Sequence, residues 1–389
     1  MKNKKSLLMT VMFTGIIAVI FIANSILLLD LVKKEIRAVI KPEYHHELMM
    51  PNEIEAVYNS NFYERMGYID INGFARRILG QKIVNGAIKD KNGYLNLVDN
   101  TEYKFDVKKE KDKSDKAIQI LEYAKESGAD ILYVQRPWKN SDESEEVLPY
   151  GITLEYGLQF NYWCERMEEE NVPVLDLREA LNEHELKFYK TDHHWTIRTS
   201  LYAAGKIINT LNDNYDLNLN EQLVDINNYD SEIFKNCFLG SQGIKTGKYY
   251  VGKDDFEVII PKFDTSTILF RYDNEGLVEK RSGNFSDAFI SYDLINDENY
   301  NNKYSSYTFD GYIENRIYNY NADNNLKVLL IADSFSRPLV TFFSQCFYET
   351  RNLDPQAGRY TDSYVEYIEE YKPDVVVMMF PGDGTFENV

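Results

Sequence analysis

Three continuous apolar runs, separated by segments with helical spacing, constrain this chain most strongly. They cover residues 130–134 (DILYV), 327–332 (KVLLIA) and 374–380 (DVVVMMF). A strand with one face in water alternates apolar and polar residues, whereas a strand buried on both faces is apolar throughout. Because predicted helices lie between these runs, the sequence predicts an α/β fold with a parallel sheet and helices on both of its faces.

The segments around these runs predict how the chain is divided. Apolar residues at helical spacing predict helices over residues 115–129, 154–170, 196–211, 338–348 and 362–371. A further strand is expected at 172–177, and a strand–turn–strand at 86–97. One α/β domain would therefore comprise residues 85–211 and 326–389.

The segment between the two parts of this domain, residues 212–325, has a different composition. It is rich in Asn, Asp, Tyr and Ser, and its short apolar runs at 256–260 and 267–271 are typical of strands. We therefore expect a β-rich insertion on the α/β domain.

The N-terminus contains an apolar run, residues 6–29, without a charged side chain. A helix of ~20 apolar residues is long enough to cross the ~30 Å hydrocarbon layer of a bilayer. We expect a cytoplasmic tail at 1–5, a transmembrane anchor at 6–29 and a helical stalk at 30–84. A cleaved signal peptide is the alternative, although the apolar run continues beyond the small residues at 23–25.

The composition excludes several classes of function. With 43 Lys and Arg against 62 Asp and Glu, the formal net charge is −19, and a nucleic-acid partner would need a basic face. The three cysteines, Cys164, Cys237 and Cys346, are too widely spaced for a Cys-x-x-Cys metal site or a disulfide framework. The chain also has no Gly-rich phosphate loop. We expect no cofactor and no metal.

The first motif that could carry chemistry is Asp192-His193-His194-Trp195, directly before a predicted helix whose N-cap would be Thr196. An Asp two residues before a His can accept the Nδ1 proton and direct Nε2 outward, as the base of a nucleophilic triad requires. The alternative interpretation of this motif is non-catalytic: Asp192 would be a turn residue, and the two histidines would be a pair on the surface.

The second motif, Asp333-Ser334-Phe335, lies where a predicted strand ends and a helix begins. In open parallel sheets, ligands bind at the carboxyl ends of the strands. A serine there is presented to the site, next to helix N–H groups that can bind an oxyanion. Alternatively, Ser334 is only the N-cap of the following helix.

The two motifs together resemble a known family. Asp192-His193-His194-Trp195 looks like the name-giving motif of the DHHW protein family, which is similar to the SGNH-hydrolase-like domains of alginate and related exopolysaccharide O-acetyltransferases. Those domains carry Asp-x-His-Trp and, later, an element with the nucleophile, which Ala332-Asp333-Ser334-Phe335 matches. Weaker likeness at 89–95, 238–241 and 245–247 extends the resemblance over most of 85–380.

The resemblance implies a flavodoxin-like SGNH fold and roles for particular residues. Ser334 would be the nucleophile, His194 the general base and Asp192 the residue that orients it. The acetyltransferases often have Thr where this chain has His193, and we expect His193 to face solvent or the sugar without a catalytic role.

The resemblance leaves the oxyanion site open. Candidates for oxyanion or substrate contacts are Gln135 or Arg136, at the end of the strand at 130–134, and the main-chain N–H of Ser334. Arg337 is another candidate, or an ordinary surface residue. Trp195 is expected to pack the loop rather than bind sugar.

The function implied is a membrane-anchored, extracytoplasmic O-acetyltransferase or acetyl esterase that acts on cell-surface polysaccharide through an acyl-Ser intermediate. The resemblance also implies partners: a multi-pass membrane acyltransferase that donates acetyl, and a polysaccharide acceptor. The chain has no evident CoA site, which agrees with a two-component system.

Two other functions fit parts of the sequence. Asp-His-His also names a family of two-metal phosphoesterases (DHH), but there the triplet follows an apolar strand, whereas residues 188–191 (FYKT) precede it here. A non-catalytic, cell-surface carbohydrate-binding or scaffolding protein is the other alternative. The 30 tyrosines would then stack on sugars, although tyrosine is also common on strand surfaces.

Overall fold

The computed structural model describes residues 2–40, 51–97, 105–139, 148–152, 156–181, 187–298, 302–309, 313–357 and 364–380. The chain forms two compact units, Met1–Ala75 and Arg76–Val389. The boundary between them falls within one helix, α3 (Arg65–Ile78).

The N-terminal unit begins with one long helix, α1 (Lys2–Ile40), followed by α2 (Pro51–Ser60). Within α1, the segment Met9–Lys34 is long and apolar enough to cross a membrane, and no other helix in the described part of the chain is. The apolar run predicted at residues 6–29 is therefore helical, with the length and composition expected of an anchor.

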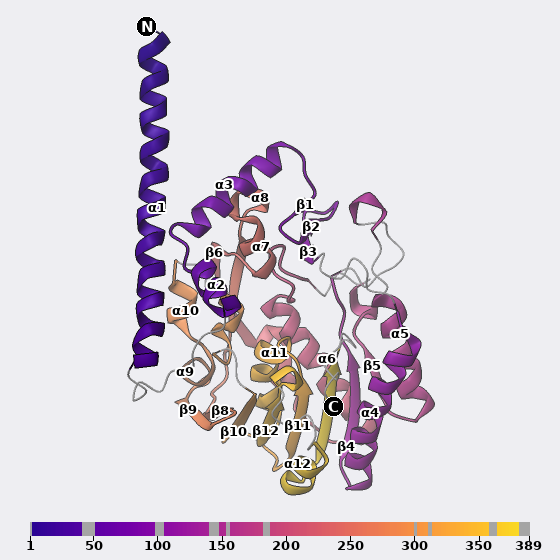
Figure 1. Cartoon of the computed structure of the whole chain (residues 1–389). Helices are drawn as coiled ribbons and strands as arrows, with labels where there is room; N and C mark the ends of the chain where they lie inside the picture. The colour runs from indigo at the N-terminus through magenta and orange to yellow at the C-terminus, as the bar shows by residue number, and fades with distance from the viewer. Residues whose placement is uncertain are drawn as a thin grey trace. The chain divides into compact units, whose positions relative to one another are not determined.

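The larger unit is organised around one eight-stranded sheet (Figure 1). In spatial order the strands are β5 (Val174–Asp176), β4 (Asp130–Gln135), β13 (Val375–Phe380), β11 (Lys327–Ala332), β12 (Glu349–Leu353), β10 (Glu314–Asn319), β8 (Thr267–Asp273) and β9 (Gly276–Gly283). The strands from β5 to β12 are parallel to one another. The strands β10, β8 and β9 are antiparallel to their neighbours, so the sheet is mixed rather than wholly parallel.

The antiparallel half of the sheet comes from the predicted insertion, which therefore extends the main sheet. The strand that joins the two halves, β12, is missing from the sequence predictions because its residues (ETRNL) are mostly polar. These polar side chains are satisfied within the sheet. Arg351 Nε donates to Glu349 Oε1 at 2.8 Å, and Asn352 Nδ2 donates to the carbonyl of Leu330 at 3.2 Å.

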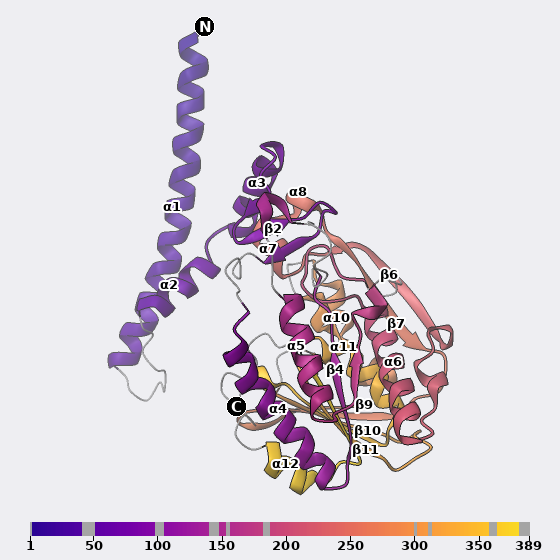
Figure 2. The same cartoon turned by 90° about the vertical axis from the view of Figure 1, so that its right-hand side faces the viewer.

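Helices cover both faces of the parallel half (Figure 2). One face carries α4 (Val107–Glu126), α5 (Tyr156–Glu169) and α12 (Tyr364–Tyr371), and the other carries α6 (Ile197–Tyr215) and α11 (Ser336–Phe343). Successive residues of a strand point to opposite faces. In β4, Ile131 and Tyr133 pack with the first set of helices, whereas Leu132 and Val134 pack with the second. This double burial explains why these strands are apolar throughout.

The helix boundaries follow from their caps. α4 begins earlier than the predicted residue 115, because the Asp106 side chain accepts the N–H groups of Lys108 and Lys109 at 3.0 and 3.2 Å. Thr196 caps α6 as predicted. α11 begins at Ser336, before the predicted residue 338. Residues 362 and 363 of the last predicted helix lie outside the described residues.

Smaller elements complete the larger unit. The strands β6 (Tyr229–Phe238) and β7 (Asp254–Pro261) form an antiparallel pair. A small three-stranded sheet contains β1 (Ile83–Val84), β2 (Ala87–Lys89) and β3 (Leu95–Leu97), and it lies where the sequence predicts a strand–turn–strand. The short helices are α7 (Ser241–Thr246), α8 (Lys248–Val251), α9 (Phe285–Phe289) and α10 (Tyr292–Asn296).

Candidate active site

The turn between β11 and α11 presents Ser334 at the carboxyl edge of the sheet. The residue that caps α11 is Phe335, and it makes no side-chain capping bond. The alternative that Ser334 is only the N-cap of this helix is therefore wrong. Instead, the Ser334 hydroxyl lies 2.8 Å from Nε2 of His194, which comes from a distant part of the chain.

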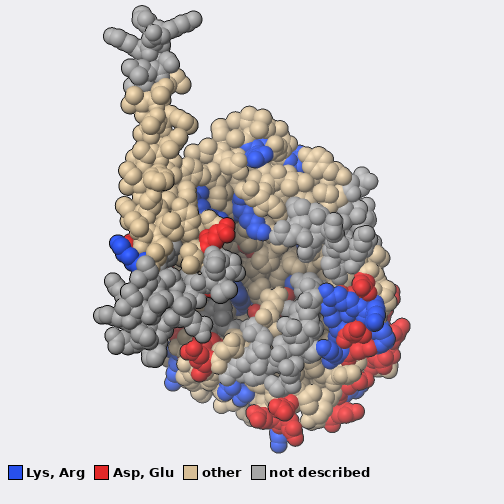
Figure 3. Space-filling model, viewed as in Figure 1, with Lys and Arg blue, Asp and Glu red and all other residues tan. Residues whose placement is uncertain are grey.

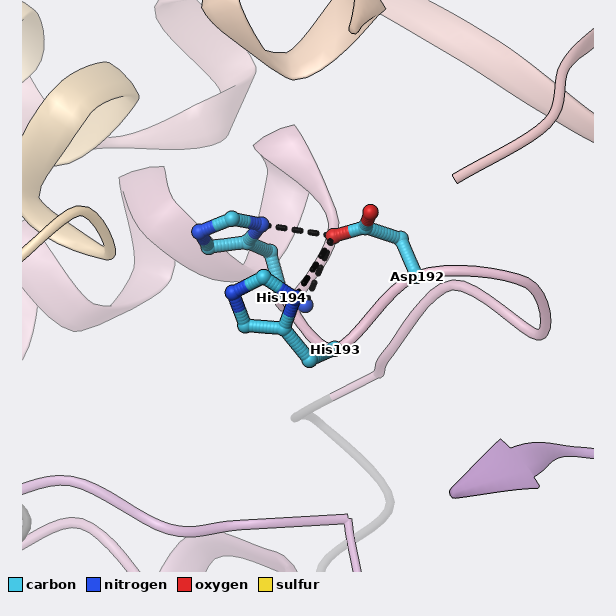
Figure 4. Close-up of side chains that lie close together, drawn as sticks. All are labelled: Asp192, His193 and His194. Carbon is cyan, nitrogen blue, oxygen red and sulfur yellow. Dashed lines mark hydrogen bonds and ion pairs between the residues drawn. The ribbon is translucent and has the colours of Figure 1, made fainter. Parts of the chain in front are cut away.

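His194 and Asp192 lie on the loop that leads into α6. Nδ1 of His194 is 2.6 Å from Asp192 Oδ1, and the same oxygen accepts the main-chain N–H of His194 at 3.0 Å (Figure 4). His194 is 3% exposed and Asp192 2% exposed, whereas Ser334 is half-buried. The structure thus brings Ser334, His194 and Asp192 into one hydrogen-bonded chain, in the order that the sequence predicts.

The insertion holds the other oxygen of Asp192. The main-chain N–H of Ser241 donates to Asp192 Oδ2 at 2.7 Å. Gly240 packs so closely that a Cβ atom there would lie 2.2 Å from the Asp192 Cβ, so a larger residue would displace the carboxylate. The weak family likeness at residues 238–241 is the only sequence signal for this contact.

Thr191 ties the same loop to the insertion a second time. Its hydroxyl donates to Asp254 Oδ2 at 2.6 Å and accepts the N–H of Gly240 at 2.9 Å. Its main-chain N–H also donates to Asp254 Oδ2, at 2.8 Å. The insertion therefore fixes the loop that carries Asp192 and His194, a role that the sequence does not indicate.

The charges in this group act on one another. Burial by itself would raise the pKa of Asp192, but the neighbouring His194 and His193 hold this pKa below its usual range. Burial lowers the pKa of His194 below that of an ordinary histidine, although Asp192 opposes this. At neutral pH, Asp192 is therefore a carboxylate and His194 a neutral imidazole. Because His194 keeps its proton on Nδ1 and donates it in a hydrogen bond to Asp192, its Nε2 has a lone pair that can accept the Ser334 proton.

Two aromatic residues hold the main-chain carbonyl of Phe335, the residue after Ser334. Trp195 Nε1 and the Tyr304 hydroxyl both donate to the carbonyl of Phe335, at 3.2 and 3.1 Å. The Tyr304 ring also stacks on the His194 imidazole, with centroids 4.0 Å apart. Trp195 is fully buried, so it packs the loop and offers no surface to a sugar. No sequence motif distinguishes Tyr304 from the other tyrosines.

The candidates for oxyanion or substrate contacts take different positions. Gln135 is buried, and its amide accepts the Tyr133 hydroxyl at 2.8 Å and donates to the Arg136 carbonyl at 2.9 Å. The oxygen and the nitrogen of this side-chain amide are thus both hydrogen-bonded within the protein. Arg337 is half-buried at the start of α11, where its Nη1 donates to Ser305 Oγ at 3.3 Å.

Arg136 is buried directly beneath the turn that carries Ser334. Its Nη2 pairs with Asp333 Oδ2 at 2.6 Å, and both side chains are 1% exposed. The guanidinium lies 3.6 Å from the centre of the Phe335 ring and 4.5 Å from that of Trp138. Arg136 therefore connects the end of β4 to the residue before Ser334.

His193 lies next to the hydrogen-bonded chain. Its ring centroid is 3.8 Å from that of His194, and its Nδ1 is 2.9 Å from Ser241 Oγ. Burial, together with the adjacent His194, lowers the pKa of His193 to about 3. His193 also borders a small cleft, whose other lining residues are Asn96, Leu97, Trp138, Lys139, Tyr156 and Gln242. That His193 faces the sugar stays a prediction.

Asp192, His193 and His194 are also a group of potential metal ligands, with donor atoms within 4.8 Å of one another. However, both ring nitrogens of His194 are already in hydrogen-bond contact, with Asp192 and with Ser334. A metal ion on His194 would have to displace one of these partners. The geometry therefore fits the activation of a serine better than metal binding.

The matching family model describes the same class of domain. Residues 101–229 match ALGX, an SGNH hydrolase-like domain described for the acetyltransferase AlgX. The chain is similar to this family over these residues, and its α/β fold is SGNH-like. The resemblance predicted from the two motifs is thereby confirmed, and the matched residues include Asp192 and His194. No curated protein matches the chain in sequence.

Two solved structures share the fold of this chain. Bacillus cereus PatB1, solved with a sulfonyl adduct, aligns with a TM-score of 0.62 at 20% identity, over 77% of this chain and 96% of PatB1. A DHHW family protein from Eubacterium siraeum aligns with a TM-score of 0.58 at 17% identity, over 78% of this chain and 93% of that protein. At such identities these likenesses establish the fold.

Proposed function

We propose that this chain is a membrane-anchored, extracytoplasmic O-acetyltransferase or acetyl esterase that acts on cell-surface polysaccharide. The observation that carries the proposal is the hydrogen-bonded chain from Ser334 Oγ through His194 to Asp192. A hydroxyl, a neutral imidazole and a buried carboxylate in this order are the groups that acyl transfer through a serine requires. The description of the matched family as an acetyltransferase favours acetyl as the acyl group.

In the first half of the reaction, Ser334 Oγ attacks the carbonyl carbon of an acetyl ester while its proton moves to His194 Nε2. Asp192 stabilises the imidazolium that forms. The tetrahedral intermediate then collapses, the bond to the leaving oxygen breaks, and His194 returns the proton to that oxygen. The product of this half is an acetyl ester on Ser334.

In the second half, His194 accepts the proton of a sugar hydroxyl, and the sugar oxygen attacks the acetyl carbonyl. The bond to Ser334 Oγ breaks, and His194 reprotonates this oxygen. Water in place of the sugar gives acetate, which is the esterase reaction. The two activities differ only in which hydroxyl reaches the acetyl-Ser334 first.

The negative charge of each tetrahedral intermediate needs hydrogen-bond donors. In the turn at 333–336, the N–H groups of Phe335 and Ser336 donate to Asp333 at 3.0 and 2.9 Å. The Ser334 N–H belongs to the nucleophile itself and takes no part in these two bonds. We assign it as an oxyanion donor, whereas Arg136 acts on this turn through Asp333.

The location and the partners are further parts of the proposal. The apolar segment of α1 would anchor the chain and leave the larger unit outside the cytoplasm. A multi-pass membrane acyltransferase would deliver acetyl groups, and a polysaccharide would accept them. The length and composition of α1 and the family resemblance support these statements.

The proposal is tested by replacing Ser334 in the full-length protein. We expect Ser334→Ala to lower the turnover of an aryl acetate by about 10⁴-fold or more, because the nucleophile is lost. Ser282→Ala, at an exposed position of β9, is the matched control and should retain full activity. Circular dichroism should give the same spectrum for both variants. Full activity of Ser334→Ala would refute the mechanism.

A covalent sulfonyl fluoride probe separates the remaining functions. Labelling of Ser334 that disappears in His194→Ala supports the proposal. No labelling, together with intact glycan binding, would favour the carbohydrate-binding alternative, and activity that a chelator abolishes would favour a metal-dependent one. Mass spectrometry of an oligosaccharide acceptor, against release of free acetate, then distinguishes transferase from esterase.

A further inference from the structure

Helix α3 has an exposed apolar face. Large apolar side chains recur on it at helical spacing and are open to solvent: Tyr68 (40% exposed), Ile71 (67%), Phe74 (52%), Ile78 (68%) and, directly after the helix, Leu79 (69%). We refer to these five residues as the α3 apolar face. Of the buried positions of the helix, Gly73 lies on the opposite side, whereas Asp70 lies one turn before Phe74, at the edge of the apolar face. A soluble surface helix normally has the reverse arrangement, with its apolar stripe buried.

The charges around this face are positive, in a chain whose net charge is −19. No Asp or Glu occurs from Ile71 to Lys89, whereas Arg76, Arg77 and Lys82 are exposed there. An interfacial helix needs this combination of an apolar face with cations beside it.

The charged side chains of the larger unit are also unevenly distributed. Arg77 Nη1 donates to the carbonyl of Tyr249 on α8 at 3.4 Å, which places Arg77 at the α8 end of this unit. Figure 3 shows mostly uncharged surface and a few basic side chains at that end, whereas many acidic side chains gather at the opposite end, over α4 and α12. An anionic membrane surface repels a strongly acidic protein unless the protein approaches through such an end.

We propose that α3 lies in the interface of an anionic lipid bilayer, with the α3 apolar face inserted and with Arg76, Arg77 and Lys82 at the head-group phosphates. Helices of this kind bury their apolar side ~5–10 Å into the boundary between head groups and acyl chains. The membrane is within reach, because the apolar segment of α1 ends at Lys34 and α3 begins at Arg65. This proposal rests on the membrane anchoring proposed above, but not on acyl transfer.

The inference changes the expected role of residues 30–84. Instead of a stalk that holds the catalytic unit away from the bilayer, this segment would end in a helix that lies on the lipid. The larger unit would then have a preferred orientation on the membrane, close to a membrane-bound acetyl donor.

The test measures the depth of α3 in the full-length protein, reconstituted into vesicles of phosphatidylcholine and phosphatidylglycerol. An environment-sensitive fluorophore is attached to Phe74→Cys and, as the matched control, to Leu277→Cys on β9, since these positions are 52% and 54% exposed. The unsubstituted chain gives the labelling background of the native cysteines, of which Cys164 and Cys346 are buried. Lipids with a quencher on the acyl chain then report contact with the bilayer.

We expect the label at Phe74→Cys to shift to shorter wavelength and to be quenched several-fold more by these lipids than the label at Leu277→Cys. Arg76→Glu/Arg77→Glu should reduce this difference, and added salt should do the same. Equal quenching at both positions, in protein that floats with the vesicles, would overturn the proposal. So would a label that is shielded from aqueous iodide but not quenched by lipid, because it would indicate a protein partner. Protein that does not float with the vesicles would refute the anchor instead.

Discussion

At the scale of single residues, a small side chain is as important to this site as the reactive ones. Asp192 can receive the Ser241 N–H on one oxygen and His194 on the other only because Gly240 leaves room for its side chain. A carboxylate held on both oxygens keeps the imidazole in one tautomer and one orientation. The position of the base therefore depends on a glycine that carries no chemistry itself.

Gly240→Ala should lower kcat for an aryl acetate by about 10²- to 10⁴-fold, because the new Cβ displaces Asp192 and misaligns His194. The matched control is Gly205→Ala on α6, where the nearest atom to a new Cβ would be at an ordinary 3.5 Å. Steady-state kinetics of both variants test this. A Gly240→Ala enzyme with unchanged kcat would contradict the dependence on Asp192.

At the scale of elements, the turn from β11 to α11 is attached to its surroundings at several points. Arg136 at the end of β4 pairs with Asp333, while Trp195 and Tyr304 donate to the carbonyl of Phe335. These contacts come from three different parts of the chain and surround Ser334 on both sides. The nucleophile is therefore positioned by tertiary contacts rather than by the turn alone.

Arg136→Met should destabilise the fold by about 3–5 kcal/mol, because it leaves the buried Asp333 carboxylate without its ion-pair partner. Arg136→Met/Asp333→Asn removes both charges and should recover part of this loss. Urea unfolding of the wild type and the two variants measures the free energies. If the single variant is as stable as the wild type, the ion pair does not hold the turn.

At the scale of the whole molecule, the insertion is part of the catalytic unit rather than an addition to it. It extends the central sheet through β8, β9 and β10, and it contributes Ser241, Asp254 and Tyr304 to the surroundings of the site. The two histidines in these surroundings, the buried His194 and the half-buried His193, also connect the stability of the whole fold to pH.

The free energy of unfolding should fall as the pH drops from about 6.5 towards 3. In this range an unfolded histidine binds a proton, whereas His193, with its pKa lowered by burial to about 3, stays neutral in the folded protein. The unfolded state then binds more protons, so acid favours it. Asp354 acts in the opposite direction, because burial raises its pKa to about 6.

A single substitution isolates the histidine in this pH dependence. Compared with the wild type, His193→Asn should lose less stability between pH 7 and about 4, because one site for uptake of a proton on unfolding is gone. Urea unfolding at both pH values gives the comparison. Parallel losses in the two proteins would exclude His193 as a source of the acid sensitivity.

Much of the fold follows from local sequence patterns. The strands β4, β11 and β13 are predictable because burial on both faces makes them apolar throughout, and the cap of α6 is predictable from Thr196. The strand β12 is not predictable in this way, because its polar residues are satisfied by partners elsewhere in the sheet. The role of Tyr304 is not predictable either, because it depends on contacts with Phe335 and His194, which are distant in the sequence.

The sequence by itself determined the α/β class, the apolar N-terminal helix and the identity of the three groups Asp192, His194 and Ser334, since these depend on residue type and on spacing along the chain. Only the tertiary structure decided that these groups meet and that Gly240 and Ser241 hold the Asp192 carboxylate. It also decided that the Gln135 side chain is hydrogen-bonded inside the protein. The physical reason is that hydrogen bonds and burial depend on distance in space, and the residues that make these contacts lie far apart in the chain.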